Sequence, residues 1–246
     1  MIPLVVAHRG AAGEAPENTL AAFRLAGEFG AGAVELDVQL SRDGTPVVIH
    51  DADVSRTTDG AGPVRRFTVA ELRRLDAGSW FAPQYRGEKI PLLQEVLELP
   101  AVPVIELKVA PGQSRLLAER VAELLGAYGR DDAVVICGTS EPLRQLERLA
   151  PGIRSLSFAG GTLTPAGPPA ALAGAGAFSA VFAPPAAGLA GSIRRATGRG
   201  AAVFGTTLWV EGPWEEYLPE QVGAGLTGVF TDDPAELREW LERLRP

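Results

Sequence analysis

Short apolar runs alternate with amphipathic segments along the chain, and this alternation is the strongest structural signal in the sequence. Eight runs are rich in Val, Ile and Phe, and several are followed by segments with apolar residues at helical spacing and by Gly or Pro. The runs are residues 4–8, 33–38, 103–108, 133–138, 154–158, 180–184, 201–206 and 228–232. The clearest helical segments are residues 19–29, 114–128, 141–149 and 234–244. Eight alternations of strand and helix predict an α/β fold of the (β/α)8 TIM-barrel type.

One spacing departs from this regular pattern. Neighbouring runs start 21 to 30 residues apart, except the second and third, whose starts at positions 33 and 103 leave room for about 40 additional residues. We therefore expect one TIM-barrel domain over residues 1–246, with a small inserted subdomain at about 51–90 between strands two and three, on the C-terminal face where barrel active sites lie. Trp80 and Phe81 are expected in the core of this insertion, and the Ala/Gly/Pro-rich segment 159–177 is expected to be a loop.

A hairpin signal precedes the insertion. Asp43-Gly44 lies between two apolar runs, which is typical of a tight turn between antiparallel strands. The second of these runs ends in His50. We expect it to fold back along strand two and to bring His50 near Glu35.

Two carboxylates lie on the second strand, at Glu35 and Asp37. Residues two apart on a strand point to the same side, so both are expected inside the barrel near its C-terminal end. Two buried carboxylates repel each other and cost several kcal/mol to desolvate, so they need a cation. That cation is either a metal ion or an Arg of the barrel.

The third strand repeats this pattern with Glu106 and Lys108. A third inward-facing carboxylate beside Glu35 and Asp37 makes an all-oxygen site, which suits one hard divalent cation, Mg²⁺ or Ca²⁺, with Mn²⁺ as a further candidate. The alternative is an internal ion pair between Glu106 and Lys108.

The motif His8-Arg9-Gly10 lies where the first strand ends. An imidazole at the mouth of a barrel can act as a general acid or base, a guanidinium is a bidentate anion clamp, and Gly10 allows the backbone to approach a ligand. His8 can also be read as a buried structural histidine. The chain has only two His, however, and His50 also follows a strand beside the carboxylates. Two imidazoles, a metal ion and the cations Arg9 and Lys108 favour phosphoryl chemistry.

Two further residues have two equally good interpretations each. Asn18 precedes the first helix, where it is either a helix N-cap or a residue that supports the site. Trp209 follows the seventh strand, where it either lines the substrate pocket as an apolar wall or packs in a loop.

Composition narrows the candidate partners. The 246-residue chain has a formal net charge of −7 and one Cys. This acidic balance argues against binding to nucleic acid or anionic membranes, which requires a basic face, and one Cys excludes a disulfide framework. The N-terminal residues have no signal-peptide pattern, so we expect a cytoplasmic protein with no stable membrane insertion. No feature of the sequence specifies an oligomeric state.

A series of motifs follows in fixed order: His8-Arg9-Gly10, Pro16-Glu17-Asn18-Thr19, Glu35-Leu36-Asp37, Asp43-Gly44, Val47-Val48-Ile49-His50-Asp51, Arg56-Thr57-Thr58, Leu75-Asp76-Ala77-Gly78-Ser79-Trp80, Ile90-Pro91-Leu92, Glu106-Leu107-Lys108 and Gly228-Val229-Phe230-Thr231-Asp232-Asp233-Pro234. In order and spacing they resemble the glycerophosphodiester phosphodiesterase family, of the PLC-like phosphodiesterase superfamily. The resemblance covers essentially the whole chain and is densest over 1–110. The chain departs from the family at 210–212, where Val-Glu-Gly replaces the usual Thr-Val-Asn, so its polar contacts to the glycerol end need not be those of the family.

The resemblance implies a TIM barrel with an insertion after strand two that hydrolyses a small-molecule glycerophosphodiester to sn-glycerol 3-phosphate and an alcohol. It also implies that the glycerol O2 of the substrate attacks the phosphate, giving a cyclic phosphate that water opens. The family roles fall on His8 and His50 as the acid/base pair, on Glu35, Asp37 and Glu106 as metal ligands, and on Arg9 and Lys108 as phosphate-binding residues. Which histidine is the acid and which the base stays open.

Two other functions compete with this interpretation. A phospholipase-type lyase of the same superfamily would release the cyclic phosphate instead of hydrolysing it. A catalytically silent barrel would bind a metal and a phosphorylated ligand without reaction. The silent barrel is disfavoured, because such a protein could lose either histidine and this chain has both.

Overall fold

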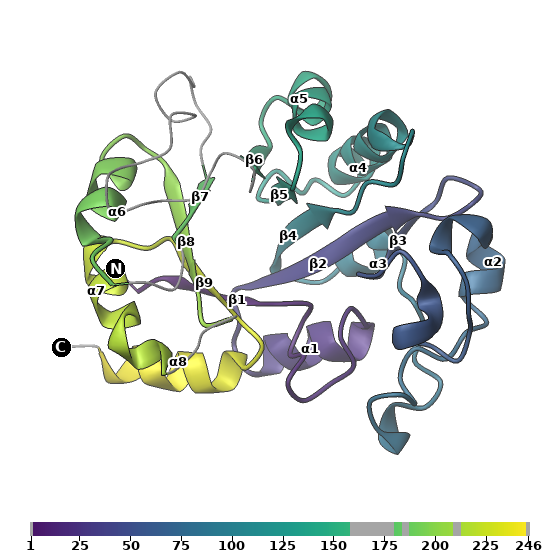
Figure 1. Ribbon diagram of the computed structural model, residues 1–246, viewed down its shortest axis with the longest axis horizontal. Helices are drawn as coiled ribbons and strands as arrows, with labels where there is room; N and C mark the ends of the chain where they lie inside the picture. The colour runs from purple at the N-terminus through teal and green to yellow at the C-terminus, as the bar shows by residue number, and fades with distance from the viewer. Residues whose placement is uncertain (1, 158–179, 184–186, 209–212, 245–246) are drawn as a thin grey trace.

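Eight parallel strands and the helices between them form an α/β fold (Figure 1). This computed structural model describes residues 2–157, 180–183, 187–208 and 213–244. The parallel strands are β1 (Leu4–Ala7), β2 (Ala33–Leu40), β4 (Val102–Leu107), β5 (Val134–Cys137), β6 (Arg154–Ser157), β7 (Ala180–Phe182), β8 (Ala202–Thr206) and β9 (Gly228–Thr231). The helices of the barrel repeats are α1 (Leu20–Glu28), α4 (Ser114–Ala127), α5 (Ser140–Leu149), α6 (Ala190–Thr197), α7 (Leu218–Ala224) and α8 (Pro234–Arg243), with the 3-10 turn η5 (Trp214–Glu216) before α7.

Hydrogen bonds join the parallel strands in the order β6-β5-β4-β2-β1-β9-β8-β7. The two end strands of this order, β6 and β7, have Cα atoms within 8 Å of each other, so the sheet curls round into a barrel. Each of the eight apolar runs in the sequence overlaps one of these strands, which confirms the predicted fold class. Helices α6 and α7 are not evident from the sequence, because both are short and each contains a glycine.

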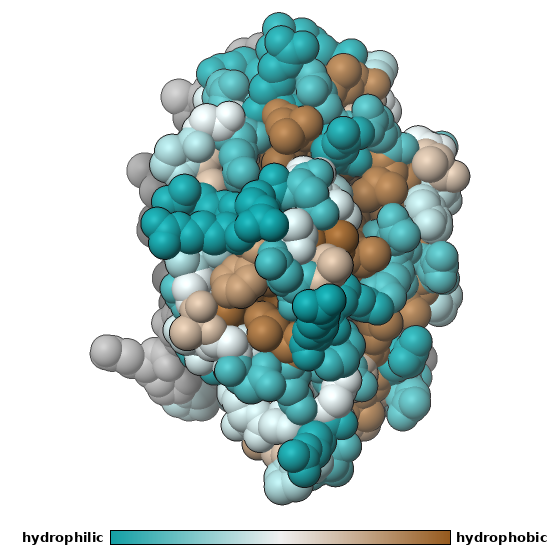
Figure 2. Space-filling view, turned by 90° about the vertical axis from the view of Figure 1, so that its right-hand side faces the viewer, coloured by the Kyte–Doolittle hydropathy of each residue, from teal (hydrophilic) through white to brown (hydrophobic). Residues whose placement is uncertain are grey.

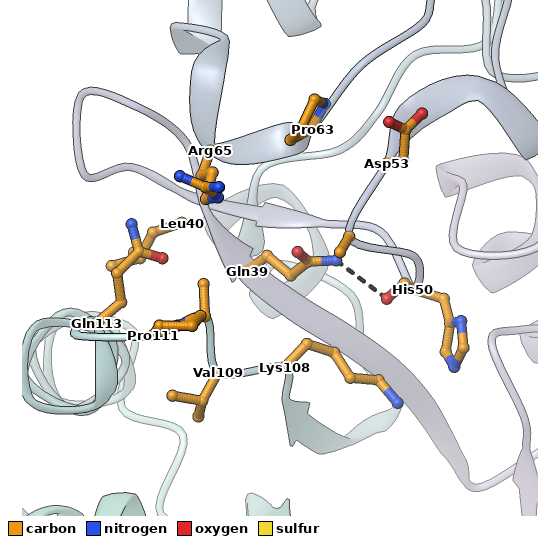
Figure 3. Close-up of a pocket in the computed structure, with 12 residues that line it drawn as sticks. Gln39, Leu40, His50, Asp53, Pro63, Arg65, Lys108, Val109, Pro111 and Gln113 are labelled. Atoms are coloured by element: carbon orange, nitrogen blue, oxygen red, sulfur yellow. Dashed lines mark hydrogen bonds between the residues drawn. The ribbon is translucent and has the colours of Figure 1, made fainter.

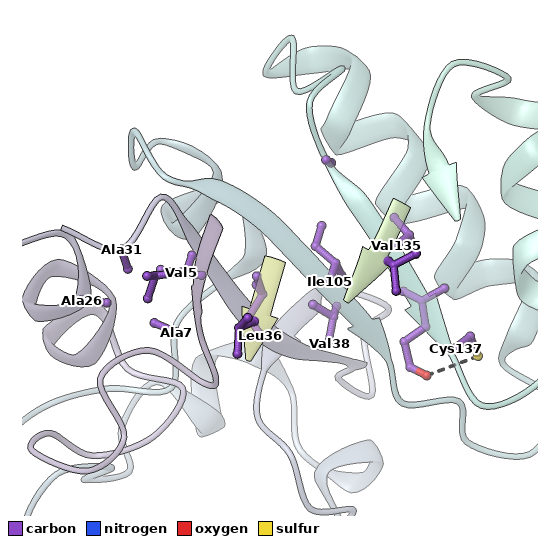
Figure 4. Packing of buried hydrophobic residues seen from close by; sticks show 14 of the residues in the cluster. Val5, Ala7, Ala26, Ala31, Leu36, Val38, Ile105, Val135 and Cys137 are labelled. Carbon is purple, nitrogen blue, oxygen red and sulfur yellow. Dashed lines mark hydrogen bonds between the residues drawn. The ribbon is translucent and has the colours of Figure 1, made fainter. Parts of the chain in front are cut away.

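The two faces of the strands have different roles. Val34, Leu36 and Val38 of β2 point outward and belong to the hydrophobic layer between the sheet and the helices (Figure 4). The intervening Glu35 and Asp37 therefore point into the barrel, as predicted. A separate hydrophobic cluster fills the barrel interior, and its fully buried members are Val6, Ala33, Val104, Val134, Ile136, Leu156, Phe204, Leu208 and Phe230.

Strand register sets the depth at which charged residues appear in the barrel. Along the inner face of β2, the apolar Ala33 is followed by Glu35 and Asp37 toward the C-terminal end. The register places Glu35 beside Val104 of β4, and Asp37 beside Glu106. Apolar side chains therefore fill the lower part of the interior, and the carboxylates gather at its C-terminal mouth.

Between β2 and β4 the chain leaves the barrel and forms several short elements. They are β3 (Pro46–Val48), η1 (Val54–Arg56), η2 (Val64–Arg66), α2 (Val69–Leu72), η3 (Pro83–Tyr85) and α3 (Leu93–Leu97). Strand β3 pairs antiparallel with β2, with Val48 opposite Val38, which confirms the predicted hairpin. Its turn contains Gly44 with φ of +75°, a left-handed conformation that glycine adopts without strain.

This segment has a hydrophobic cluster of its own. The buried members are Val47, Ile49, Val54, Val64, Leu72, Ala77 and Ile90. Trp80 and Phe81 are outside this cluster, so the prediction that they lie in its core is wrong. Trp80 is 40% exposed, and its indole N–H donates to the carbonyl of Ala77 at 3.0 Å. Aliphatic side chains fill the cluster, and the Phe81 ring instead makes edge contacts with the rings of Trp80 and Tyr85.

The molecular surface on the side of α2 and α4 is mostly hydrophilic. Figure 2 shows hydrophobic atoms on this face in smaller groups between charged and polar side chains. Among the described residues, no helix combines the length and the apolar character needed to cross a lipid bilayer. The expected loop at 159–177 lies outside the described residues.

We expect Leu72→Ala to lower the free energy of unfolding by about 2–5 kcal/mol, because it would leave a cavity in the cluster between β2 and β4. Leu72 is fully buried there. Urea denaturation followed by circular dichroism measures the change. Leu149→Ala is the matched control, since Leu149 is 47% exposed and its loss should change stability by no more than about 0.5 kcal/mol. Equal losses in both variants would contradict a packed core in this segment.

Candidate active site

Three carboxylates meet at the mouth of the barrel. Glu35 and Asp37 come from β2 and are 2% and 1% exposed, and Glu106 comes from the neighbouring strand β4. One oxygen from each carboxylate lies within 4.8 Å of the other two. The strand register described above produces this arrangement, because it aligns Asp37 with Glu106.

Electrostatic repulsion acts strongly on this cluster. Burial raises the pKa of Glu35 well above its ordinary value, and the neighbouring carboxylates of Asp37 and Glu106 raise it further. Lys108 offsets part of this repulsion, since its Nζ lies 2.7 Å from Glu106 Oε1 and 3.2 Å from Asp37 Oδ1. Burial by itself would lower the pKa of Lys108, but the charges of Asp37 and Glu106 outweigh it and raise that pKa. The alternative considered from the sequence, an ion pair between Glu106 and Lys108, is therefore present, and it lies within the carboxylate cluster.

The donor set fits a hard divalent cation. All three side chains offer oxygen, which Mg²⁺ and Ca²⁺ prefer over nitrogen or sulfur. Asp37 Oδ1 is buried and accepts no hydrogen bond from the described residues, even though Lys108 lies close enough for a charge contact. A buried carboxylate oxygen without a donor is costly, and a bound cation would satisfy it.

The turn after β1 supplies further partners to the two carboxylates of β2. The backbone N–H of Arg9 donates to Glu35 Oε2 at 2.9 Å. The side-chain amide of Asn18 donates to Asp37 Oδ2 at 2.7 Å, and its Oδ1 accepts from the backbone N–H of Asp37 at 3.1 Å. Thr19, rather than Asn18, caps α1 by accepting from the N–H of Ala22. Of the two interpretations of Asn18, the structure therefore favours support of the site.

The guanidinium of Arg9 lies beside the same carboxylates. Its Nε is 3.4 Å from Asp37 Oδ2, and its Nη1 donates to Glu17 Oε1 at 2.9 Å. The sequence left open whether a metal ion or an Arg neutralises the β2 carboxylates. Arg9 supplies part of this neutralisation through its contact with Asp37. Gly10 was expected to let the backbone approach a ligand, but the structure shows it in close contact with α1. A Cβ at Gly10 would lie 2.7 Å from the backbone of Ala22, so the missing side chain makes room for this helix.

His8 is oriented by an Asp from the opposite end of the chain. Its Nδ1 lies 2.7 Å from Asp232 Oδ1, just after β9, and its Nε2 lies 3.9 Å from Glu35 Oε2. A carboxylate only accepts hydrogen bonds, so Nδ1 carries the proton in the neutral ring and Nε2 is the nitrogen that can take one up. The ring is 14% exposed at the mouth of the barrel.

His50 has a matching arrangement. Its Nδ1 lies 2.6 Å from Asp51 Oδ1, which again assigns the proton-exchanging role to Nε2. The amide nitrogen of Gln39, at the end of β2, donates to the carbonyls of Ile49, His50 and Asp51 at 2.9, 3.0 and 2.7 Å. Figure 3 shows the bond to His50. One strand therefore carries both the clustered carboxylates Glu35 and Asp37 and the residue that fixes the turn bearing His50.

An ion-pair bridge joins the two turns that carry the histidines. Arg56 donates to Asp51 Oδ2 at 2.6 Å and to both oxygens of Glu17 at 2.7 and 2.8 Å. The Arg56 guanidinium lowers the pKa of Asp51. Burial opposes the corresponding shift at Glu17, but Arg56 and Arg9 outweigh it and lower the pKa of Glu17. Both carboxylates therefore stay ionised and hold the two turns together.

Sequence reasoning missed several of these supporting residues. Asp51, Glu17, Arg56 and Asp232 all lie within the motifs recognised in the sequence, but no role followed from their position alone. Gln39 carried a usable signal, because it continues the inward-facing alternation of Glu35 and Asp37. Trp209, predicted as a substrate-binding residue, lies outside the described residues.

Comparisons with known proteins agree with this geometry. A sequence profile of the Glycerophosphoryl diester phosphodiesterase family matches residues 8–236. A glycerophosphodiester phosphodiesterase of Caldanaerobacter subterraneus subsp. tengcongensis is 35% identical over 251 residues, covering 96% of this chain and 97% of that protein. The Bacillus subtilis relative YhdW is 51% identical over 127 residues, so the match spans about half of each protein, 50% of this chain and 52% of YhdW.

Two solved structures resemble the whole chain. A phosphodiesterase of Oleispira antarctica, solved in complex with the product sn-glycerol-3-phosphate, has a TM-score of 0.79 and 29% identity, covering 98% of this chain and 97% of that one. A glycerophosphodiester phosphodiesterase from Agrobacterium tumefaciens has a TM-score of 0.78 and 29% identity, covering 95% and 98%. The fold and the family are therefore shared over nearly the full length.

We expect Glu35→Gln to stabilise the metal-free protein near neutral pH. Burial raises the pKa of Glu35, so the folded protein binds this proton more tightly than the unfolded chain. The stability linked to this proton is fully present below the ordinary Glu pKa and is lost as the pH rises through the raised value. In chelator, the unfolding temperature of the wild type should therefore fall relative to that of Glu35→Gln as the pH rises above the ordinary Glu pKa and through the raised one.

The lowered pKa values of Glu17 and Asp51 do not interfere with this comparison, because their contribution to stability is complete above the ordinary carboxyl pKa. The comparison is repeated in a His8→Ala background, because His8 Nε2 lies 3.9 Å from Glu35 Oε2 and its interaction changes with the charge of Glu35. Glu239→Gln is the matched control, since the Glu239 side chain is 74% exposed. A difference between wild type and Glu35→Gln that does not vary with pH would contradict the raised pKa.

Proposed function

The chain belongs to the glycerophosphoryl diester phosphodiesterase family and is a glycerophosphodiester phosphodiesterase, and we propose that it releases sn-glycerol 3-phosphate and an alcohol by metal-dependent catalysis with two histidines. One observation carries this proposal: His8 and His50, each held by an Asp, lie at the barrel mouth that also holds three clustered carboxylates. The product in the Oleispira antarctica structure supports the same reaction.

Glu35, Asp37 and Glu106 would hold one divalent cation, Mg²⁺ or Ca²⁺, with Mn²⁺ as a further candidate. Their oxygen atoms and the unsatisfied Asp37 Oδ1 support this assignment. When bound, the cation supplies charge stabilisation at a phosphate oxygen and acidifies an adjacent hydroxyl group. Asn18 and the backbone of Arg9 keep the two β2 carboxylates in position.

The side chains of Arg9 and Lys108 would bind the phosphate group of the substrate. Both cations already lie beside Asp37, at 3.4 and 3.2 Å, so they border the carboxylate cluster. Their positive charges offset the local excess of carboxylates, so an anionic substrate can bind at this site although the protein as a whole is acidic. Preorganised cations of this kind stabilise the charge that builds up on the phosphate oxygens in the transition state.

The two imidazoles would move the protons. One accepts the proton of the attacking hydroxyl at Nε2, while the other, protonated at Nε2, gives its proton to the oxygen of the leaving alcohol. If the glycerol O2 attacks, its new bond to phosphorus forms as the bond to the alcohol breaks, and the product is a cyclic phosphate. Water then opens the ring with the histidine roles reversed. Asp232 and Asp51 hold the rings in the required orientation.

Three further expectations from the sequence concern the insertion, Trp209 and the location of the protein. Residues at about 51–90 are proposed as an inserted subdomain of the single 1–246 domain, and their hydrophobic cluster supports this division. Trp209 is proposed to line the substrate pocket. The cytoplasmic location stays a prediction.

We expect His8→Ala and His50→Ala each to lower kcat/KM for glycerophosphocholine by about 10²- to 10⁴-fold, because each removes one proton transfer. Circular dichroism should show an unchanged fold. Arg66→Ala, on the exposed side of η2, is the control and should keep wild-type activity. Full activity in either histidine variant would contradict the acid/base assignment. If phosphorus NMR of the wild-type reaction shows a cyclic phosphate that persists, the result favours the lyase over the hydrolase.

We expect exhaustive chelation by EDTA to abolish hydrolysis, and added Mg²⁺ or Ca²⁺ to restore it, because the cation neutralises the carboxylates and the phosphate. Titration of each metal against the chelated enzyme measures the recovery, and the same titration on Glu106→Gln should require more metal. Activity that survives complete chelation would show that the three carboxylates do not form a required metal site.

A further inference from the structure

A cavity of about 500 Å³ opens beside the carboxylate site (Figure 3). Its walls come from the end of β2, from the segment between β3 and η2, and from the residues that follow β4. The side chains used below are Gln39, His50, Arg65, Lys108 and Gln113. A cavity of this size is within the range that holds small molecules.

The cavity adjoins the place where the phosphate is proposed to bind. His50 and Lys108 line it, whereas His8, Arg9 and the three clustered carboxylates do not. In Figure 3 the Lys108 ammonium and the His50 ring lie on one side of the view, and Arg65 and Gln113 lie on the other. A substituent of the phosphate that extends past His50 and Lys108 therefore enters this cavity.

The polar groups of the lining are mostly hydrogen-bond donors. Arg65 provides an exposed guanidinium, and Gln113 provides a side-chain amide facing the same space. The amide nitrogen of Gln39 is committed to the backbone of the His50 turn, so its carbonyl oxygen remains as an acceptor. The carboxylate of Asp53 accepts from the backbone N–H groups of Ser55 and Gly62.

This lining suits one class of alcohol better than others. Guanidinium and amide groups match the hydroxyl groups of a polyol. Recognition of a quaternary ammonium group relies on Phe, Tyr or Trp rings, and none of these is among the described residues of the lining. The proposed pocket wall at Trp209 is assigned to the glycerol half of the substrate. Lys108 is paired with Glu106 and Asp37, and Asp53 accepts from two backbone N–H groups. Among the described residues of the lining, the Arg65 guanidinium is therefore the charged group left to meet a ligand, which favours hydroxyl acceptors over a cationic alcohol.

Building on the proposed function, we propose that this cavity binds the alcohol moiety of the substrate and that Arg65, assisted by Gln113, selects hydroxyl-rich alcohols such as glycerol and inositol over choline. Arg65 is then a specificity-determining residue. It stands apart from the proton-transferring histidines and from the carboxylate cluster, so its loss should leave the chemistry intact.

The test compares kcat/KM for glycerophosphoinositol, glycerophosphoglycerol and glycerophosphocholine in wild type, Arg65→Ala and Gln113→Ala, with saturating metal. Wild type should prefer the two polyol substrates. Arg65→Ala should lower kcat/KM for them by roughly tenfold, the effect of one lost hydrogen bond to a charged group, while glycerophosphocholine changes by less than about threefold. Gln113→Ala should have a smaller effect in the same direction.

Two controls make this result specific. Arg66→Ala removes a neighbouring exposed guanidinium that is outside the cavity lining, and it should change no substrate preference. Inhibition by sn-glycerol 3-phosphate should be the same in wild type and Arg65→Ala, because that half of the substrate binds outside the cavity. The unfolding temperature of each variant reports whether the fold is kept.

Three results would overturn the proposal. An equal loss for all three substrates, or weaker inhibition by sn-glycerol 3-phosphate in Arg65→Ala, would place Arg65 on the phosphate or glycerol side. An unchanged kcat/KM for every substrate in Arg65→Ala would show that the alcohol does not use this cavity. If wild type hydrolyses none of the three substrates, the proposed function itself fails, and that outcome is distinct because it appears before any variant is compared.

Discussion

The burial of carboxylates at the C-terminal ends of β2 and β4 is the constraint on which the rest of the structure depends. Glu35 and Asp37 are nearly inaccessible to water, and Glu106 lies beside them. Such a cluster is tolerated only if each oxygen finds a donor or a cation. Lys108 and the Asn18 amide supply part of this compensation. Lys108 directly follows β4 and Asn18 lies in the turn before α1, so the carboxylates are satisfied only when β1, β2 and β4 are assembled in their native register.

Backbone strain and carboxylate burial are coupled in the turn after β1. Arg9 and Asn18 have φ of +55° and +57°, a left-handed conformation that costs non-glycine residues about 1–3 kcal/mol each. The same conformation directs the N–H of Arg9 to Glu35 and the amide of Asn18 to Asp37. The hydrogen bonds to the buried carboxylates therefore offset the strain, and the strained turn in return keeps the carboxylates hydrogen-bonded. Loss of either partner should weaken both.

Features that depend on local sequence pattern could be predicted from the sequence. Alternation placed Glu35 and Asp37 on the inner face of β2, and the Asp43-Gly44 turn placed β3 along that strand. The sequence was insufficient where a contact depends on closure of the barrel. Asp232 meets His8 across 224 residues because β9 pairs with β1, and no local signal specifies that contact. The prediction that Trp80 is buried was wrong for a related reason. Its burial depends on how fully the aliphatic residues of the same segment pack together, and no local pattern specifies this.

The position of His50 keeps the proposed proton-transfer group apart from the proposed substrate-selecting group, although both belong to one segment. His50 belongs to the chain that leaves the barrel, yet its turn is fixed by Gln39 of β2 through three backbone carbonyls. Arg56 adds a second anchor by joining this turn to Glu17 in the turn before α1. The imidazole is thus positioned relative to the barrel by Gln39 and Arg56, independently of the exposed residues beyond Arg56. Arg65 lies among those residues, so the cavity wall can change with little effect on the placement of the histidine.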